Sequence, residues 1–161
     1  MIGTMKLRKN SATVQVLLAL VPYTRQNLML TFRPTQFFDE MEKTSKYSAA
    51  TLNVAFQRAK RQKLITVKQN TMSFSLSARQ TVQPFIAQQL QGGGKLMVIF
   101  DIPEDSAHIR RELRFVLIQL GFKQIQRSVW MSDRDHRQLL KETIEVLDAG
   151  EWVRLYEAAR V

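Results

Sequence analysis

The sequence predicts an α+β chain in two parts, and three observations point to it. Apolar residues first recur at helical spacing and later alternate as they do in strands. The run from Gly92 to Gly94 is typical of a linker. Charge also divides there: residues 1–94 hold 13 Lys and Arg against 3 acidic residues, whereas residues 95–161 hold 11 of each. The whole net charge of +10 therefore belongs to the first part, which predicts a polyanionic partner for it.

Composition excludes several classes of protein. A chain of 161 residues buries one ordinary core or two small ones. It has no cysteine, so thiolate metal sites, disulfides and cysteine nucleophiles are excluded, and a cytoplasmic location is expected. The apolar stretch Val14–Val21 is too short to span a membrane, and no membrane association is expected.

Three helices are predicted in the basic part. The first begins at Ser11 or Thr13 and ends at Pro22, and residues 23–32 are ambiguous between helix and strand. Pro34 opens the second helix, and the third begins at Ala49 after a polar break. The third helix has an apolar stripe of Leu52, Ala55, Phe56 and Ala59. Two short helices with a tight break predict a helix-turn-helix.

A hairpin follows the third helix. Residues 64–68 and 72–76 alternate as strands, and Gln69 and Asn70 form the turn. Three helices followed by a hairpin is the winged-helix order, expected over residues 1–76. Residues 77–94 are expected to be a helical connector, with Pro84 starting its second part, and a glycine linker.

The outward face of the third helix supplies the candidate DNA contacts. Asn and Gln pair with adenine edges, and Arg pairs with guanine or phosphate. The alternative is an ordinary solvated charged face. The predicted contact residues are Thr51, Asn53, Gln57, Arg58, Lys60 and Arg61 on the helix, with Lys63 and Lys68 beside the tip of the wing.

The second part has the pattern of a ferredoxin-like domain over residues 95–161. An apolar strand at 95–100 is followed by a helix that Ser106 caps and Gly121 ends. Two short strands lie within residues 122–132, a helix covers residues 134–147 and ends at Gly150, and a last strand covers residues 151–158. The order βαββαβ is the ferredoxin-like topology.

Several motifs of this part resemble a known family. They are Phe100-Asp101-Ile102-Pro103-Glu104, the residues Arg110, Arg111, Leu113 and Arg114, then Leu120-Gly121-Phe122, and Ser128-Val129-Trp130. They resemble the central domain of the PaaX family of transcriptional repressors, which is similar in fold to the dimeric small CRISPR adaptation subunit. That domain follows a winged helix in the family, so the resemblance covers about residues 10–160. It implies DNA binding and dimerisation. The family's acyl-CoA effector is not implied, because PaaX repressors carry a further C-terminal region beyond the part that the resemblance covers.

Asp101 is the one catalytic candidate. The resemblance to the adaptation subunit places an aspartate at the end of the first strand, where some members are metal-dependent nucleases. A carboxylate there could hold Mg²⁺. We instead expect Asp101 to begin a loop, accepting amide hydrogen bonds or pairing with Arg127. His108 and His136 are expected on polar helix faces, and no metal site is predicted.

These observations predict a sequence-specific transcriptional repressor that binds a palindromic operator in double-stranded DNA as a homodimer. No enzymatic activity, cofactor or small-molecule effector is predicted. The alternatives are a metal-dependent nuclease that uses Asp101, and a non-catalytic nucleic-acid-binding protein of the CRISPR adaptation type.

Overall fold

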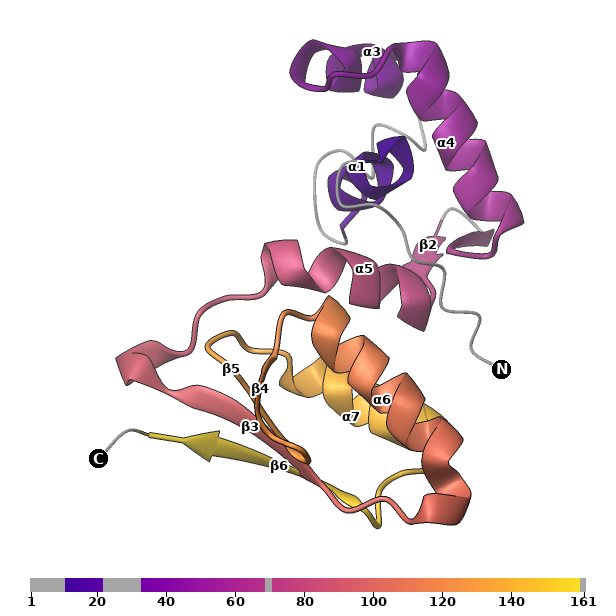
Figure 1. The fold of residues 1–161 in the computed structure, drawn as a ribbon. Helices are drawn as coiled ribbons and strands as arrows, with labels where there is room; N and C mark the ends of the chain where they lie inside the picture. Colours follow the sequence, from indigo (N-terminus) through magenta and orange to yellow (C-terminus); the bar gives the residue numbers. More distant parts are fainter. Residues whose placement is uncertain (1–10, 22–32, 69–70, 160–161) are drawn as a thin grey trace. The chain divides into compact units, whose positions relative to one another are not determined.

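A computed structural model describes residues 11–21, 33–68 and 71–159 (Figure 1). The chain is α+β, as predicted, and forms two compact units, Met1–Val82 and Gln83–Val161. Within the described residues, no helix is long and apolar enough to cross a membrane. The ambiguous segment 23–32 and the turn at residues 69–70 lie outside the described residues.

The first unit contains α1 (Ala12–Ala19), α3 (Pro34–Thr44), α4 (Ala49–Arg61), and the antiparallel strands β1 (Ile65–Lys68) and β2 (Thr71–Phe74). The predicted helix starts are confirmed. Ser11 caps α1, because its Oγ accepts a hydrogen bond from the Val14 N–H at 3.3 Å, and Pro34 opens α3. The core collects the apolar faces of these elements, including the whole predicted stripe of α4.

The helix α5 (Leu76–Ile86) crosses the division between the units. The prediction that Pro84 starts a separate helical part is wrong, because Pro84 lies inside the last turn of α5. Proline there removes one N–H donor, but the next turn still closes, with the Ala87 N–H donating to Gln83 O at 2.9 Å. Arg134 Nη1 also donates to the carbonyls of Pro84 and Ala87, at 3.2 Å each, and these bonds stabilise the helix end.

The second unit holds a four-stranded antiparallel sheet with two helices on one face (Figure 1). Its elements are β3 (Lys95–Phe100), α6 (Ala107–Gln119), β4 (Lys123–Gln126), β5 (Val129–Ser132), α7 (Arg137–Val146) and β6 (Val153–Ala158). The strand order is β4-β5-β3-β6. Leu96, Val98 and Phe100 of β3 point to the helix side and are buried. A 3₁₀ turn, η1 (Gln91–Gly93), precedes β3, and a second, η2 (Glu104–Ser106), precedes α6.

The other face of this sheet carries half-exposed apolar side chains. Met97 lies opposite Met131 on one side and Tyr156 on the other, and Ile99 lies opposite Val129. These residues alternate with the buried positions of the strands, so they share the face away from α6 and α7. Within the described part of the second unit, no helix covers this surface, which we call the open sheet face.

One predicted helix cap is confirmed and two need correction, and the helix predicted from residue 134 begins at Arg137. Gly121 ends α6 as predicted, with φ +80° and the Phe122 N–H donating to Leu117 O at 3.0 Å. The second helix, however, ends with Asp148 in the same left-handed conformation, at φ +51°, rather than at Gly150. Ser106 occupies the cap position of α6 without capping it, because its hydroxyl donates to Asp105 instead.

Candidate nucleic-acid interface

The start of α4 is fixed by side chains on both sides of the turn that precedes it. Ser48 Oγ accepts a hydrogen bond from the Thr51 N–H at 3.3 Å, and Glu42 Oε2 of α3 accepts one from the Ala49 N–H at 3.2 Å. Ser45 in the same turn donates to Gln15 Oε1 of α1 at 2.6 Å. These bonds satisfy N–H groups at the helix start and set the direction in which α4 leaves α3.

The outward face of α4 brings together all the candidate contacts that were predicted on it. The inner stripe is buried in the core, and the remaining positions after Ala49 are exposed. Gln57 Nε2 donates to Asn53 Oδ1 at 3.4 Å, and Lys60 Nζ lies 5.7 Å from the centre of the Phe56 ring. The exposed candidates are Thr51, Asn53, Gln57, Arg58, Lys60 and Arg61.

Lys63 is not beside the tip of the hairpin, so this part of the prediction is wrong. It adopts φ +56° directly after α4, and its N–H donates to Lys60 O at 3.0 Å. The next N–H, of Leu64, returns to Ala59 O at 2.9 Å, which completes a Schellman helix end. Lys63 is therefore exposed at the base of the hairpin. Lys68 pairs with Thr71 next to the turn, and its side chain lies outside the described residues.

A groove of about 600 Å³ lies along this part of α4. Asn53, Gln57 and Lys60 line it from α4, the first turns of α3 form a second wall, and Val67 and Met72 of the hairpin line it as well. Asp39 is the acidic residue in its lining. The arrangement offers amide donors and acceptors, a cation and apolar surface side by side, which are the groups that read base edges and hold phosphates.

Asp101 follows β3 and is exposed. Its backbone N–H donates to Trp152 O at 3.0 Å. The expected pairing of its carboxylate with Arg127 or with amides is not seen among the described residues. Glu104 instead binds Arg110, with 2.7 Å between Oε2 and Nη2, and this contact lowers the pKa of Glu104. Across the described ranges, no three His, Asp or Glu side chains are grouped as metal ligands.

His136 corrects a second prediction, because it is fully buried rather than on a polar helix face. Its ring lies 5.4 Å from that of Phe122, centre to centre, and neither ring nitrogen has a hydrogen-bond partner among the described residues. Burial lowers the pKa of His136 from 6.5 to about 4, and the positive charge of Arg134 contributes. The imidazole is therefore neutral at pH 7. His108 is exposed, as predicted.

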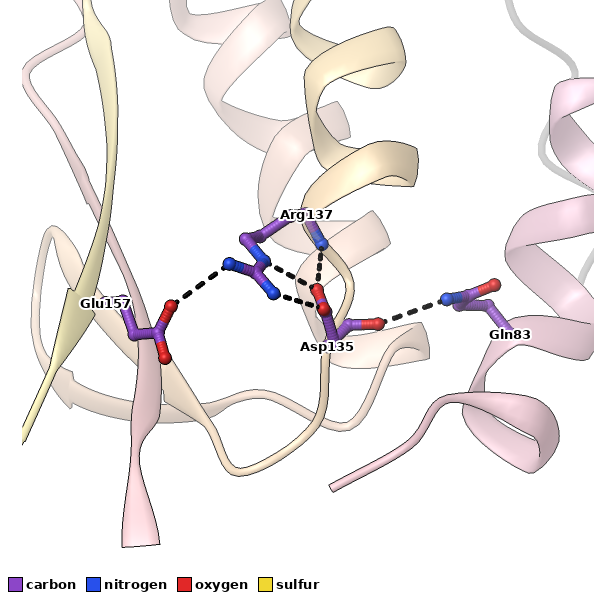
Figure 2. A network of polar contacts seen from close by, with 4 residues as sticks. All are labelled: Gln83, Asp135, Arg137 and Glu157. Atoms are coloured by element: carbon purple, nitrogen blue, oxygen red, sulfur yellow. Dashed lines mark hydrogen bonds and ion pairs between the residues drawn. The ribbon is translucent and has the colours of Figure 1, made fainter. Parts of the chain in front are cut away.

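A polar network at the start of α7 was missed by the sequence prediction (Figure 2). Arg137 donates to Asp135 at 2.6 and 3.0 Å and binds Glu157 of β6 at 3.0 Å. These contacts lower the pKa of Asp135 and raise that of Arg137. Gln83 donates to the Asp135 carbonyl at 3.3 Å. The Arg137 guanidinium is thus bound by two carboxylates. Together with the Gln83 hydrogen bond, these contacts join the last turn of α5 to the start of α7 and to β6. An Asp shortly before a helix was the one available signal.

The comparison with known proteins concerns the second unit. Residues 92–161 match the family description "PaaX protein central Cas2-like domain". A search of curated proteins found no match to the chain. The match covers the sheet and both of its helices, together with the motifs from which the resemblance was drawn. Residues 92–161 are therefore similar to the central Cas2-like domain of the PaaX family.

Proposed function

We propose that this protein is a sequence-specific transcriptional repressor that binds a palindromic DNA operator as a homodimer. The observation that carries the proposal is the outward face of α4. Arg58, Lys60 and Arg61 stand on it beside two exposed amides, and α4 contains no acidic residue. This face belongs to the part of the chain that holds the whole excess of positive charge.

In this proposal the first unit is a winged helix and the second is ferredoxin-like. Helix α3 and helix α4 are joined by four residues, 45–48, and a two-stranded hairpin follows, as in a winged helix. In the second unit, the order βαββαβ and the central position of β5 and β3 suit the ferredoxin-like topology. The functional boundaries remain those expected from the sequence: residues 1–76, 77–94 and 95–161.

The proposed roles follow the position of each residue along α4. Thr51, Asn53 and Gln57 read base edges, because the first turns of a recognition helix lie deepest in the major groove. Cations at the helix end hold phosphates, which supply affinity without sequence preference. The residues in this second group are Arg58, Lys60, Arg61 and Lys63, with Lys68 on the wing.

The open sheet face is the proposed dimer surface. Its apolar centre of Met97, Ile99, Val129 and Met131 would be covered by the same face of a second copy, since a two-fold axis pairs one patch with itself. Two copies related in this way present two α4 helices to a palindrome. Repression then follows because the bound dimer excludes RNA polymerase from the promoter.

The test is binding to the DNA upstream of the protein's own gene and to unrelated DNA across a salt series. We expect roughly a thousandfold preference for the upstream fragment. Arg61→Ala should lower the affinity about tenfold and reduce the salt slope by about one. Arg111→Ala, which removes an exposed arginine from α6, is the matched control and should leave binding unchanged. Equal binding to both DNAs, or full affinity in Arg61→Ala, contradicts the proposal.

A second candidate is a metal-dependent nuclease, favoured by the exposed and unpartnered carboxylate of Asp101 within the described residues. Among the described residues, no three His, Asp or Glu side chains are grouped as metal ligands, so a Mg²⁺ ion would also need Asp101 of the partner subunit. In the reaction, water adds to phosphorus while the ester oxygen leaves and takes up a proton. Labelled DNA and RNA with Mg²⁺ or Mn²⁺ test this candidate. Cleavage that Asp101→Asn abolishes supports it, and absence of cleavage by the unaltered protein rules it out.

A further inference from the structure

A line of four exposed residues runs along the middle of the outward face of α4. Ala50, Val54, Gln57 and Arg61 lie one turn apart from each other, directly opposite the buried stripe. The line changes character along the helix. Its first half is small and apolar, and its second half is polar and positively charged.

Val54 is unusual in this position because 55% of its surface is exposed at the centre of a face that otherwise attracts polyanions. It does not contribute to the core, which the inner stripe of α4 fills. It lies beside Asn53 and one turn before Gln57, whose amides are 3.4 Å apart. An apolar side chain is thus flanked by the two amides on the candidate base-reading turns.

The chemistry of the major groove assigns a partner to this combination. The C5-methyl group of thymine is the apolar group that base pairs present there, and Ala, Val or the Thr methyl group can contact it. Asn and Gln form two hydrogen bonds with adenine N6 and N7. Both kinds of contact select A·T pairs, whereas the arginines of α4, which are proposed to hold phosphates, stand at its far end.

We propose that Val54 contacts a thymine methyl group, and that Asn53 or Gln57 reads an adenine beside it, so that the centre of each half-site consists of A·T pairs. This inference rests on the proposed function, because it requires α4 to enter the major groove. It adds a specificity determinant, Val54, and names the bases that it selects.

The experiment removes the methyl group from the DNA and its contact from the protein. A duplex selected from a random library by the full-length protein is synthesised with thymine or with uracil at each position in turn. At the contacted position, uracil should weaken binding about fourfold, the ratio expected from losing burial of one methyl-sized group. Val54→Ala should weaken binding to the thymine duplex by a similar factor. The Val54→Ala variant should then bind the thymine and uracil duplexes with equal affinity, because the contact with the methyl group is already lost.

The chain provides a matched control. Val146 on α7 is 57% exposed, so Val146→Ala removes the same atoms from an exposed helical position in the other unit. It should retain the full dependence on thymine. Circular dichroism verifies that both variants fold. Equal affinity of the unaltered protein for every thymine and uracil duplex overturns the inference, as does an unchanged uracil effect in Val54→Ala. Failure to select any sequence contradicts the proposed function instead.

Discussion

His136 is a residue whose environment predicts a pH dependence of stability. Burial lowers its pKa from 6.5 to about 4 in the folded state. The unfolded chain therefore takes up a proton at higher pH than the folded protein does. The free energy of unfolding is expected to fall as the pH decreases from about 6.5 to 4, by about 3 kcal/mol from this group. Urea unfolding at a series of pH values, followed by tryptophan fluorescence, measures the free energy of unfolding of the second unit, which contains both tryptophans.

The control for this prediction is the other histidine. His136→Leu fills a similar volume without a titratable group, so its stability should lose most of the dependence between pH 6.5 and 4. His108 is exposed, and His108→Leu should leave the pH profile unchanged. If His136→Leu retains the full acid sensitivity, protonation of the buried imidazole is not its cause.

The left-handed backbone conformation of Lys63 destabilises the folded protein, and a glycine at this position would avoid the destabilisation. Lys63 has φ +56° at the Schellman end of α4, a conformation unfavourable for residues with a side chain. Lys63→Gly is expected to raise the free energy of unfolding of the first unit by about 1 kcal/mol, measured by circular dichroism. It should also weaken DNA binding and lower the salt slope by about one. Asp148→Gly, at φ +51° after α7, should be stabilising without this effect on binding. If the salt slope of Lys63→Gly is unchanged, Lys63 does not contact a DNA phosphate.

At the scale of elements, the helix caps of α4 and α6 give a matched pair of serines. Ser48 Oγ accepts the Thr51 N–H, whereas Ser106 makes no capping bond. Ser48→Ala is therefore expected to lower the free energy of unfolding of the first unit by about 1 kcal/mol. Ser106→Ala should change stability by less than about 0.5 kcal/mol. Thermal unfolding of both variants by circular dichroism measures the difference. Equal losses would show that the hydroxyl of Ser48 does not act as a cap.

The elements that sequence predicts well are those with a strong local pattern. The stripe of α4 repeats over three turns, and the apolar run of β3 has the length of one strand, so the start of α4 and both ends of β3 were predicted correctly. Elements fixed by distant contacts were predicted less well. Pro84 is a local helix breaker, yet Arg134, 50 residues away, bonds to its carbonyl and supports the helix end. The burial of His136 likewise depends on Phe122, which no helical spacing reveals.

At the scale of the whole molecule, charge segregation located the candidate interface from sequence alone. The six predicted residues of α4 share one exposed face because all are set by a single helix period. Lys63 lies at the base of the hairpin because it precedes β1, and its left-handed backbone was not predicted, since residues other than glycine rarely adopt it. The network around Arg137 was missed because its carboxylates are 2 and 20 residues away. Residue spacing predicts which side chains share a face of a helix or strand. Contacts between elements, such as those of Arg137, depend on tertiary packing and are not predicted by spacing.

The open sheet face leads to the prediction about assembly. If this face pairs two copies, Ile99→Lys places a charge in its apolar centre and should yield a monomer in sedimentation equilibrium. Ile118→Lys is the matched control, because Ile118 is 63% exposed on α6 and lies off the sheet; it should remain a dimer. The Ile99→Lys monomer should lose on the order of 10²-fold or more in affinity for a palindrome, because the second half-site no longer adds to binding. Its affinity for a single half-site should match that of the unaltered protein, since α4 is untouched. If Ile99→Lys remains a dimer with full operator affinity, the two copies do not pair through the open sheet face.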